Sequence, residues 1–383
     1  MILREELEEL MGKELSDYLF DTFPEESIAR MNKQKVREIL KVLNRENLKE
    51  MILANGGTLL PKGNATRVEG ALQVLDENKD KLGRDILERS GSVLTGNNQE
   101  TMNELIDLFS TDKRLSIDML RTNPSILARG NPENILAILD VLGEKKVGLT
   151  VIRRCGDILV NGNPTNISEV IDTIDDEYGL DRSIFETNAA ILVKGSRPRI
   201  KGVLKALDDT KIGRQVLETN GDILVKSDGD KITGVSQILD IDFIKDHPIV
   251  LTASSVQNVS DMCRILKEHG LDHITKKSAK VLTVSPKGAE KTITLFEGNL
   301  LRKQLESSPS LLSAYGYNFL LSRINYLKSN SIPLTVEDEE VEKLNPDITI
   351  SSEKFKKKYG ISNKQLQSEY GEMKSRKKTD IDR

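Results

Sequence analysis

Cationic side chains recur at a regular interval in this sequence, and together they could bind phosphate groups. Each of these positions lies two residues after a leucine that recurs about every 32 residues. If the copies stack, the side chains align beside the N-termini of the helices that follow, where free N–H groups and the helix dipole favour anions. In the first six copies the positions are Lys62, Gly96, Arg129, Asn161, Lys194 and Lys226.

This row predicts contacts with a nucleic-acid backbone, because lysine and arginine release counterions when they neutralise phosphates. A row of ordinary solvated turns is the alternative, since lysine is common in turns. The polar residues that follow the row are expected to cap helices rather than read bases, because Asn and Ser side chains accept N–H bonds in the first helical turn. They are Asn64, Asn97, Asn131, Asn163 and Ser196.

The end of the chain carries a second basic cluster. Residues 351–383 hold ten basic and five acidic residues, and Lys356, Lys357 and Lys358 are consecutive. These lysines are candidates for contact with nucleic acid or an acidic partner, and a solvated terminus is the alternative. By contrast, residues 1–30 hold nine acidic and three basic residues, and residues 31–350 are nearly balanced, with 46 acidic and 43 basic.

Residues for catalysis or metal binding are scarce. The chain has three histidines and two cysteines. His269 and His273 are four residues apart with Cys263 nearby, but Gly270 interrupts the helical spacing that a metal site would need. No phosphate-binding loop, dinucleotide-binding glycine motif or nucleophile elbow occurs. We therefore expect no enzyme activity, no metal and no cofactor.

Composition narrows the class of protein further. Over its 383 residues, 37% are hydrophobic, 30% are charged and only 4% are aromatic, and the formal net charge is -4. Two cysteines exclude a disulfide scaffold. No apolar run reaches the roughly 18 to 20 residues of a membrane span. The acidic N-terminus has neither a signal-peptide nor a transit-peptide pattern, so we expect a cytoplasmic protein without membrane association.

An internal repeat dominates the sequence. The recurring leucines, which we call anchor leucines, are spaced by 34, 33, 32, 33, 32, 27, 31 and 30 residues. An aliphatic residue always precedes the anchor, and a small residue or proline stands three positions before it. The anchors are Leu60, Leu94, Leu127, Leu159, Leu192, Leu224, Leu251, Leu282 and Leu312.

Apolar positions after each anchor have the spacing of one face of an α-helix. Ile135, Leu139 and Leu142 follow Leu127 at offsets of 8, 12 and 15, and other copies repeat the pattern. In the eighth copy the apolar face shifts by one residue, to Ala289, Ile293 and Phe296.

Each copy is therefore expected to form a helix, a tight turn around the anchor, and a second helix. Because neither helix can bury its apolar stripe alone, the copies must stack. The prediction is an all-α fold, a right- or left-handed α-solenoid of nine to ten helix-pair repeats of 30–34 residues. We expect an acidic cap at 1–30, the repeat array at 31–334 and a C-terminal extension with a basic tail at 335–383.

The repeat resembles the mitochondrial transcription termination factor (mTERF) family. The likeness rests on a helix followed by Asn-Pro-Ser-Ile-Leu at 123–127, on similar lines at 244–251 and 305–312, and on a Leu-Lys-x-x-x-Ile-Pro-Leu ending at 327–334. Residues 351–359 are similar to the closing segment of such proteins, so the resemblance covers about residues 50–360. Transcription activator-like effector repeats are a second resemblance, although their Gly-Gly-Lys-Gln run is missing.

The mTERF resemblance implies a superhelical array that holds nucleic acid in a groove and acts in transcription, replication or RNA processing. We expect a monomer that binds nucleic acid, with double-stranded DNA favoured over RNA. The near-neutral body, the lack of a transit peptide and the proline kept in only three of nine motifs depart from the family pattern. An α-solenoid scaffold that binds a protein or peptide partner, without catalysis, is the alternative.

Overall fold

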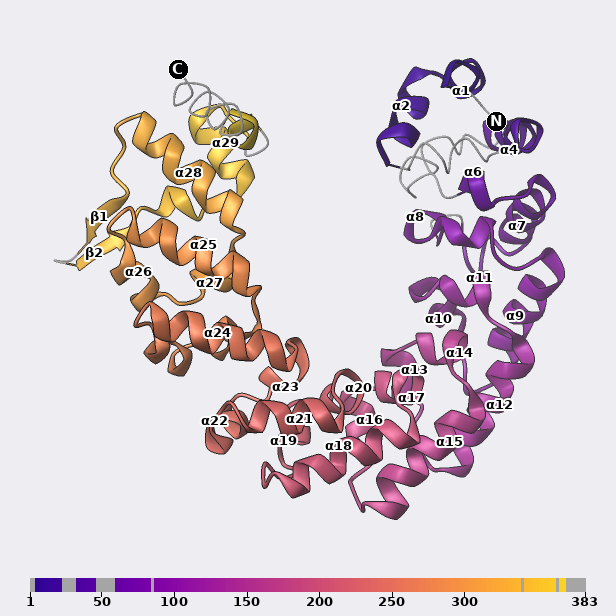
Figure 1. Cartoon of the computed structure of the whole chain (residues 1–383). Coiled ribbons are helices and arrows are strands. Elements are labelled where there is room, and N and C mark those ends of the chain that lie inside the picture. Colours follow the sequence, from indigo (N-terminus) through magenta and orange to yellow (C-terminus); the bar gives the residue numbers. More distant parts are fainter. Residues whose placement is uncertain are drawn as a thin grey trace. The chain divides into compact units, whose positions relative to one another are not determined.

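The computed structural model describes residues 4–22, 32–45, 59–83, 86–338, 341–362 and 365–369, and these are mostly helical (Figure 1). The all-α prediction is confirmed apart from one short β-hairpin. The chain divides into two compact units, residues 1–201 (unit 1) and 202–383 (unit 2), which are described in turn. None of the described helices is long and apolar enough to cross a membrane.

Each complete repeat consists of three helical elements instead of the expected two. In the third repeat, a leading helix, α10 (Ile117–Thr122), ends at Asn123, whose φ of -131° and ψ of 76° break the helix. The anchor Leu127 then lies in a short anchor helix, α11 (Ser125–Arg129), and a long helix, α12 (Pro132–Glu144), follows. The prediction of a tight turn at the anchor is therefore wrong, because the residues around it complete their own helical turn.

The break explains the small residues in front of the anchors. Gly156, the residue three before Leu159, is in the α region, and the helix break falls one residue earlier, at Cys155. A Cβ atom added to Gly156 would lie 2.0 Å from Nδ2 of Asn123 in the preceding repeat. At this position the residue therefore stays small because the side chain of Asn123 from the preceding repeat lies against it.

Unit 1 begins with α1 (Arg4–Met11), α2 (Lys13–Thr22) and α4 (Lys33–Arg45). Its leading helices are α8 (Ile86–Arg89), α10, α13 (Thr150–Arg154) and α16 (Ser183–Thr187). Its anchor helices are α6 (Leu59–Lys62), the 3-10 helix η1 (Gly91–Leu94), α11, α14 (Asp157–Asn161) and α17 (Ala190–Lys194). Its long helices are α7 (Ala65–Glu77), α9 (Gln99–Thr111), α12 and α15 (Pro164–Asp172). Helix α15 is continued by a π-helical turn, η2 (Thr173–Glu177). A further long helix, α18 (Arg197–Asp209), spans the boundary between the two units.

The elements of unit 1 pack in chain order. Each long helix from α7 to α15 contacts the next long helix, and each anchor helix from α6 to α17 contacts the next anchor helix. The anchor helices also contact both the leading helices and the long helices (Figure 1). Successive repeats of unit 1 therefore stack on one another, as the unpaired apolar stripes require.

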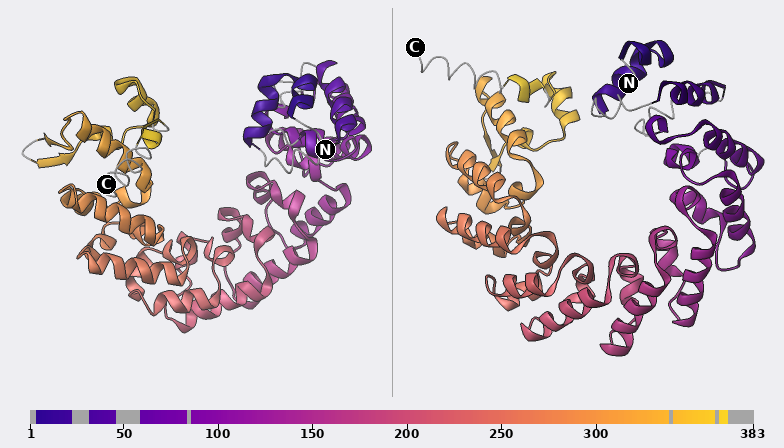
Figure 2. Two further views of the ribbon diagram at one scale, coloured as in Figure 1. Left: turned by 45° about the horizontal axis from the view of Figure 1, so that its top comes forward. Right: turned by 45° about the vertical axis from the view of Figure 1, so that its right-hand side comes forward.

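Unit 2 repeats the same three elements. Its leading helices are α19 (Val216–Thr219), α22 (Ile241–Asp246), the 3-10 helix η3 (Asp272–Lys276) and α26 (Arg302–Ser307). Its anchor helices are α20 (Ile223–Lys226), α23 (Val250–Ala253), the 3-10 helix η4 (Ala279–Thr283) and α27 (Leu311–Ala314). Its long helices are α21 (Gly229–Ser236), α24 (Val256–Glu268), α25 (Pro286–Glu297) and α28 (Tyr317–Ser329), and both views of Figure 2 show α24 and α25 side by side.

The anchor leucines form the centre of both cores. All nine are buried, with at most 6% of the residue surface exposed. The helical face predicted from offsets 8, 12 and 15 is buried at Ile135, Leu139 and Leu142. The shifted face of the eighth repeat is also confirmed, since Ala289, Ile293 and Phe296 are buried in α25.

A short extension follows the last long helix of unit 2. Strands β1 (Thr335–Asp338) and β2 (Val341–Leu344) form an antiparallel hairpin, and then a 3-10 turn, η5 (Pro346–Ile348), leads into α29 (Ser352–Tyr359). The hairpin was not expected from the sequence. The boundaries predicted at residues 30 and 334 stay predictions.

The extension is held to α28 by the fully buried Arg323. Its guanidinium donates hydrogen bonds to the carbonyl oxygens of Asp347 (3.0 Å) and Ile350 (2.6 Å). The same group lies 4.2 Å from the ring centres of Phe319 and Phe355. Burial lowers the pKa of Arg323 to about 10, so the side chain still carries its charge at neutral pH.

Candidate nucleic-acid interface

The predicted row of polar side chains exists in unit 1 as a set of exposed helix ends. Arg129, Asn161 and Lys194 are the last residues of α11, α14 and α17, and all three are exposed. Because these anchor helices contact one another in series, the three side chains belong to adjacent positions of the stack. Lys62 ends α6, but its side chain lies outside the part that the structure describes.

The row is interrupted in the second repeat for a steric reason. The residue there is Gly96, and a Cβ atom added to it would lie 2.0 Å from the carbonyl oxygen of Ala128 in the next repeat. No side chain fits at this position without moving the backbone. The row therefore has a gap between Lys62 and Arg129.

The row loses its free charge in unit 2. Lys226 ends α20 and is exposed, but its ammonium forms an ion pair with Asp222 one helical turn earlier. The next three repeats place Ala253, Val284 and Ala314 at the equivalent position. Among the described residues of unit 1, in contrast, neither Arg129 nor Lys194 forms an ion pair, so these two are the cations of the row best placed to meet a ligand.

A ladder of asparagine hydrogen bonds fixes the backbone directly after each row residue. Gly130, Gly162 and Gly195 each follow a row residue, and an asparagine of the preceding repeat donates its side-chain amide to each glycine carbonyl. Asn97 reaches Gly130 at 2.8 Å, Asn134 reaches Gly162 at 3.1 Å and Asn166 reaches Gly195 at 3.0 Å.

The ladder was missed in the sequence, although a signal for it is present. Asn134 and Asn166 each stand three residues after a cap asparagine in an Asn-Pro-x-Asn run. Each rung satisfies a backbone acceptor across a repeat boundary, so it determines where the row residue lies relative to the preceding repeat.

The helix-capping prediction is confirmed at three positions and wrong at one. The Asn131 side chain accepts the N–H of Asn134 at 2.8 Å, and Asn163 and Asn64 cap α15 and α7 in the same way. Asn97 does not cap a helix, because its neighbour Asn98 takes that role and frees Asn97 for the ladder. At Ser196 the described contact is a backbone hydrogen bond, in which the N–H of Ile200 donates to the Ser196 carbonyl oxygen.

Charge is unevenly distributed between the elements of unit 1. Each of the segments 117–130, 150–162 and 182–195, which contain leading and anchor helices, has two basic residues and one acidic residue. Three of the long-helix segments are acidic, with four acids and no base in 97–112, three acids and two bases in 131–146, and six acids and no base in 163–181, whereas α18 has four bases and two acids. In the third to fifth repeats, the segments that carry the row are therefore more basic than the segments of α9, α12 and α15.

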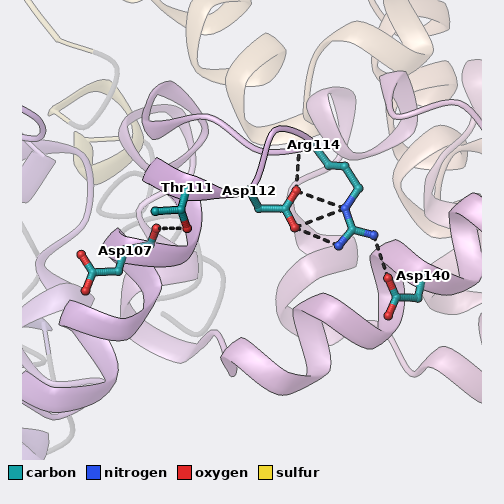
Figure 3. A network of polar contacts seen from close by, with 5 residues as sticks. All are labelled: Asp107, Thr111, Asp112, Arg114 and Asp140. Atoms are coloured by element: carbon teal, nitrogen blue, oxygen red, sulfur yellow. Dashed lines mark hydrogen bonds and ion pairs between the residues drawn. The ribbon is translucent and has the colours of Figure 1, made fainter.

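Several other cations are already paired within the fold. Arg114, after α9, hydrogen-bonds to Asp112 and reaches Asp140 of the next long helix at 2.7 Å (Figure 3). The hydrogen bond from Arg114 holds the pKa of Asp112 below its usual range. In the next repeat Lys145 forms an ion pair with Asp172 at 2.5 Å. These cations join neighbouring long helices, so we do not count them as ligand contacts.

The C-terminal basic cluster is only partly available. Lys356 and Lys357 are exposed on α29, whereas the ammonium of Lys358 is 2.6 Å from a carboxylate oxygen of Asp347. This contact raises the pKa of Lys358. The further basic residues at 374–378 lie outside the described residues.

The histidines and Cys263 do not form a cluster. Nδ1 of His269 lies 3.0 Å from a carboxylate oxygen of Glu297, and His273 is exposed in η3. Cys263 is half-buried, and burial raises the pKa of its thiol. Within the described residues, no group of three or more His, Cys, Asp or Glu side chains is arranged to hold a metal ion.

Comparison with known proteins identifies no relative that would assign a role to the candidate interface. The sequence matches no protein-family model and has no significant match among curated proteins. The resemblance to mTERF repeats therefore stays an expectation drawn from the repeat motif.

Proposed function

We propose that this chain is an α-solenoid that binds nucleic acid along the side formed by its leading and anchor helices. The observation that carries the proposal is the pair of exposed cations at equivalent helix ends, Arg129 and Lys194, with Asn161 between them in the stack. Neither cation forms an ion pair with a described residue. The excess of basic residues in those helices of the third to fifth repeats, and of acidic residues in the segments of α9, α12 and α15, supports it. Binding of this kind depends on phosphate contacts and varies little with sequence.

Double-stranded DNA is the proposed ligand, held as in the mTERF-like repeats that the sequence resembles, with a role in transcription. The asparagine ladder supports a regular contact, because it sets the position of each row residue from the repeat before. Exposed Lys356 and Lys357 on α29 are proposed as an additional contact, and Lys62 and Lys226 as weaker members of the row.

The test is fluorescence anisotropy with labelled duplex DNA, single-stranded DNA and RNA over a salt series. The double variant Arg129→Glu with Lys194→Glu should weaken duplex binding by about 30- to 100-fold and reduce the slope of log K against log salt by about 2, since each phosphate contact contributes about 0.9. Adding Lys62→Glu and Lys226→Glu should abolish binding.

A matched control variant changes the net charge by the same amount at two positions outside the row. Lys79 and Lys113 are exposed cations that follow α7 and α9, outside the row, and reversing both should leave the affinity within about twofold if backbone contacts are local. If the row variant also stays within twofold of the parent, the row is not the contact surface and the proposal is wrong.

A protein-binding scaffold without catalysis is the second candidate, and the acidic long helices of unit 1 favour it. Exposed Glu100, Glu104 and Asp107 on α9 would suit a basic peptide. In that case none of the three nucleic acids binds at low salt, and a labelled lysine-rich peptide binds with an affinity that falls when Glu100 and Glu104 are changed to lysine.

A further inference from the structure

Aromatic side chains are scarce in this chain, but they gather at the end of unit 2. Of the seven tyrosines and eight phenylalanines, six lie between residues 315 and 359. Tyr315 stacks on Phe319, with ring centres 5.3 Å apart and planes inclined by 19°. The guanidinium of Arg323 lies 4.2 Å from the ring centres of Phe319 and Phe355. Arg323 and Phe355 are fully buried and Tyr315 is not, so Tyr315 is the end of the stack that reaches the surface.

Tyr315 stands in the turn that carries the row in the other repeats. It is the residue directly after anchor helix α27, as Gly195 is the residue directly after α17. At Gly195 the side chain of Asn166 from the preceding long helix forms a rung of the ladder. At the last repeat boundary the residue equivalent to Asn166 is Gly288, because each directly precedes the first buried residue of its long helix. This boundary therefore has an aromatic ring in the turn and no asparagine side chain opposite it.

The space beside the Tyr315 ring is open. A Cβ atom added to Gly316 would meet no atom within 4 Å apart from its chain neighbours. A Cβ atom added to Gly288 would have the Cβ of Ser285, at 3.8 Å, as its nearest neighbour. Ala314 is exposed as well. Because one face of the Tyr315 ring is covered by the stack, these small neighbours leave the other face accessible to a flat ligand.

Groups that favour an anion lie next to this turn. Lys287 is exposed in the first turn of α25, which contacts both α27 and α28, and it forms no ion pair with a described residue. Helix α28 begins after Gly316, which has no side chain to cap it, and the N–H groups of Tyr317 and Asn318 have no acceptor among the described residues. We do not count Lys291, because its ammonium already lies 5.4 Å from the ring centre of Tyr317.

The combination of these groups selects a nucleotide as the occupant. The face of a tyrosine ring stacks on a planar base, and a cation beside free helical N–H groups favours a phosphate. A carbohydrate would use the ring but not the charge, and a cationic ligand would be repelled by Lys287. Bases inside a duplex are paired and stacked on their neighbours, so their faces are not available to Tyr315. An unpaired base of a single strand is available.

We propose that Tyr315 stacks on an unpaired base of single-stranded nucleic acid. Lys287 and the N–H groups at the start of α28 bind the phosphate that adjoins this base. Stacking of this kind accepts any base, because every base has an aromatic face. The site lies in unit 2 and goes beyond the duplex contacts proposed for unit 1, on which it does not depend.

The test uses the full chain and a nine-nucleotide oligothymidine that contains one central 2-aminopurine, a fluorescent base that is quenched when it stacks on an aromatic ring. The parent protein should quench this probe in a saturable titration. Tyr315→Leu should remove the quenching and weaken binding of the oligonucleotide by about tenfold, the effect of losing one stacked base. Tyr315→Phe keeps the ring and should quench as the parent does.

The phosphate contact is tested with a pair of lysine variants. Lys287→Met should weaken binding about threefold and reduce the slope of log K against log salt by about 0.7, the value for one phosphate of a single strand. Lys267→Met is the matched control, because Lys267 is exposed in the last turn of the neighbouring helix α24. It should change neither the affinity nor the slope.

A probe without bases tests the stacking without any change to the protein. An abasic oligomer of the same length keeps the phosphates, and it should bind the parent at least about tenfold more weakly. Hydrogen exchange of α28 should be equal in the parent and in Tyr315→Leu, which shows that the variant is folded. Absence of quenching, equal quenching by the folded Tyr315→Leu variant, or equal binding of the abasic oligomer would overturn the proposal.

Two further measurements separate this site from other sources of binding. Equal quenching of the 2-aminopurine mononucleotide at the same concentration would overturn the proposal in favour of a free nucleotide. The double variant Arg129→Glu with Lys194→Glu should quench as the parent does, and loss of quenching in this variant together with its retention in Tyr315→Leu would assign the contact to the row instead. Duplex binding is measured in parallel, and its loss or retention bears only on the function proposed for unit 1.

Discussion

Replacing Arg323 by methionine should release the C-terminal extension from unit 2 without unfolding the rest. Methionine fills much of the same apolar volume between Phe319 and Phe355, but it leaves the carbonyl oxygens of Asp347 and Ile350 without their donor. Hydrogen bonds to a charged group contribute about 1.5–3 kcal/mol each, and a desolvated cation–π contact contributes about 2 kcal/mol.

Part of this loss is offset because the methionine variant no longer buries a charged guanidinium, whose desolvation is unfavourable. Since desolvation also lowers the pKa of Arg323 to about 10, that cost is real in this protein. We expect the net loss to be about 3 kcal/mol. It should act on η5 and α29, which have no other buried cation among the described residues of the extension.

Native-state hydrogen exchange measures this effect locally, which matters because repeat proteins do not unfold as a single unit. The variant should raise exchange in α29 by about two orders of magnitude and leave α12 unchanged. Lys357→Met is the matched control, since Lys357 is exposed on α29. Exchange in α29 within about threefold of the parent would refute the assigned role of Arg323.

Two further predictions concern contacts between repeats. Asn134→Ala removes the rung to Gly162 and should destabilise the boundary by about 1 kcal/mol, seen as faster exchange in α14, whereas Asn103→Ala on α9, where the described residues give no such bond, should not. The ion pair of Asp112 with Arg114 should be lost in acid, because the pKa of Asp112 is lowered in the folded protein. Its contribution to stability is complete above the ordinary carboxyl pKa near 3.9. The contribution disappears as the pH falls through the lowered pKa. Asp112→Asn should remove that part of the acid sensitivity, and a pH titration of exchange in α9 with no difference between parent and variant would contradict it.

Much of the fold was predictable from short-range patterns. The anchors Leu127 and Leu159 are buried where the repeat required, and the one-residue shift at Ala289 is present in α25. Capping by Asn131 and Asn163 follows from local geometry, since the acceptor and its N–H lie within three residues. Interactions of this kind involve residues of a single repeat, so the local sequence is enough to predict them.

Features that depend on two repeats at once were not predictable in the same way. Asn97 was expected to be a cap, and its partner Gly130 is 33 residues away. The gap at Gly96 depends on contact with Ala128 of the next repeat. The helix around each anchor was missed because four or five residues carry too little periodicity to distinguish a helical turn from a loop.

The local surroundings of each row cation, rather than the net charge of the chain, distinguish the members of the row. Lys226 looked equivalent to Lys194, but only Lys226 has an acid at i-4. That acid is Asp222, the N-cap residue of α20, and it forms an ion pair with Lys226. At Lys194 the same position is Ala190, so no local acid can neutralise the lysine. Comparison of each row residue with the residue four before it would have separated the two from sequence alone.

The ion pairs between long helices complicate the meaning of any salt dependence. Raising the salt concentration screens phosphate contacts at Arg129 and Lys194, but it also weakens the exposed pair of Arg114 with Asp140. A steep salt slope could therefore come from loosened repeats rather than from displaced counterions. Asp140→Asn separates the two causes, because it removes the pair and leaves the row unchanged. If counterion release is the cause, this variant shifts affinity little and keeps the parent slope, whereas the row variant lowers the slope by about 2.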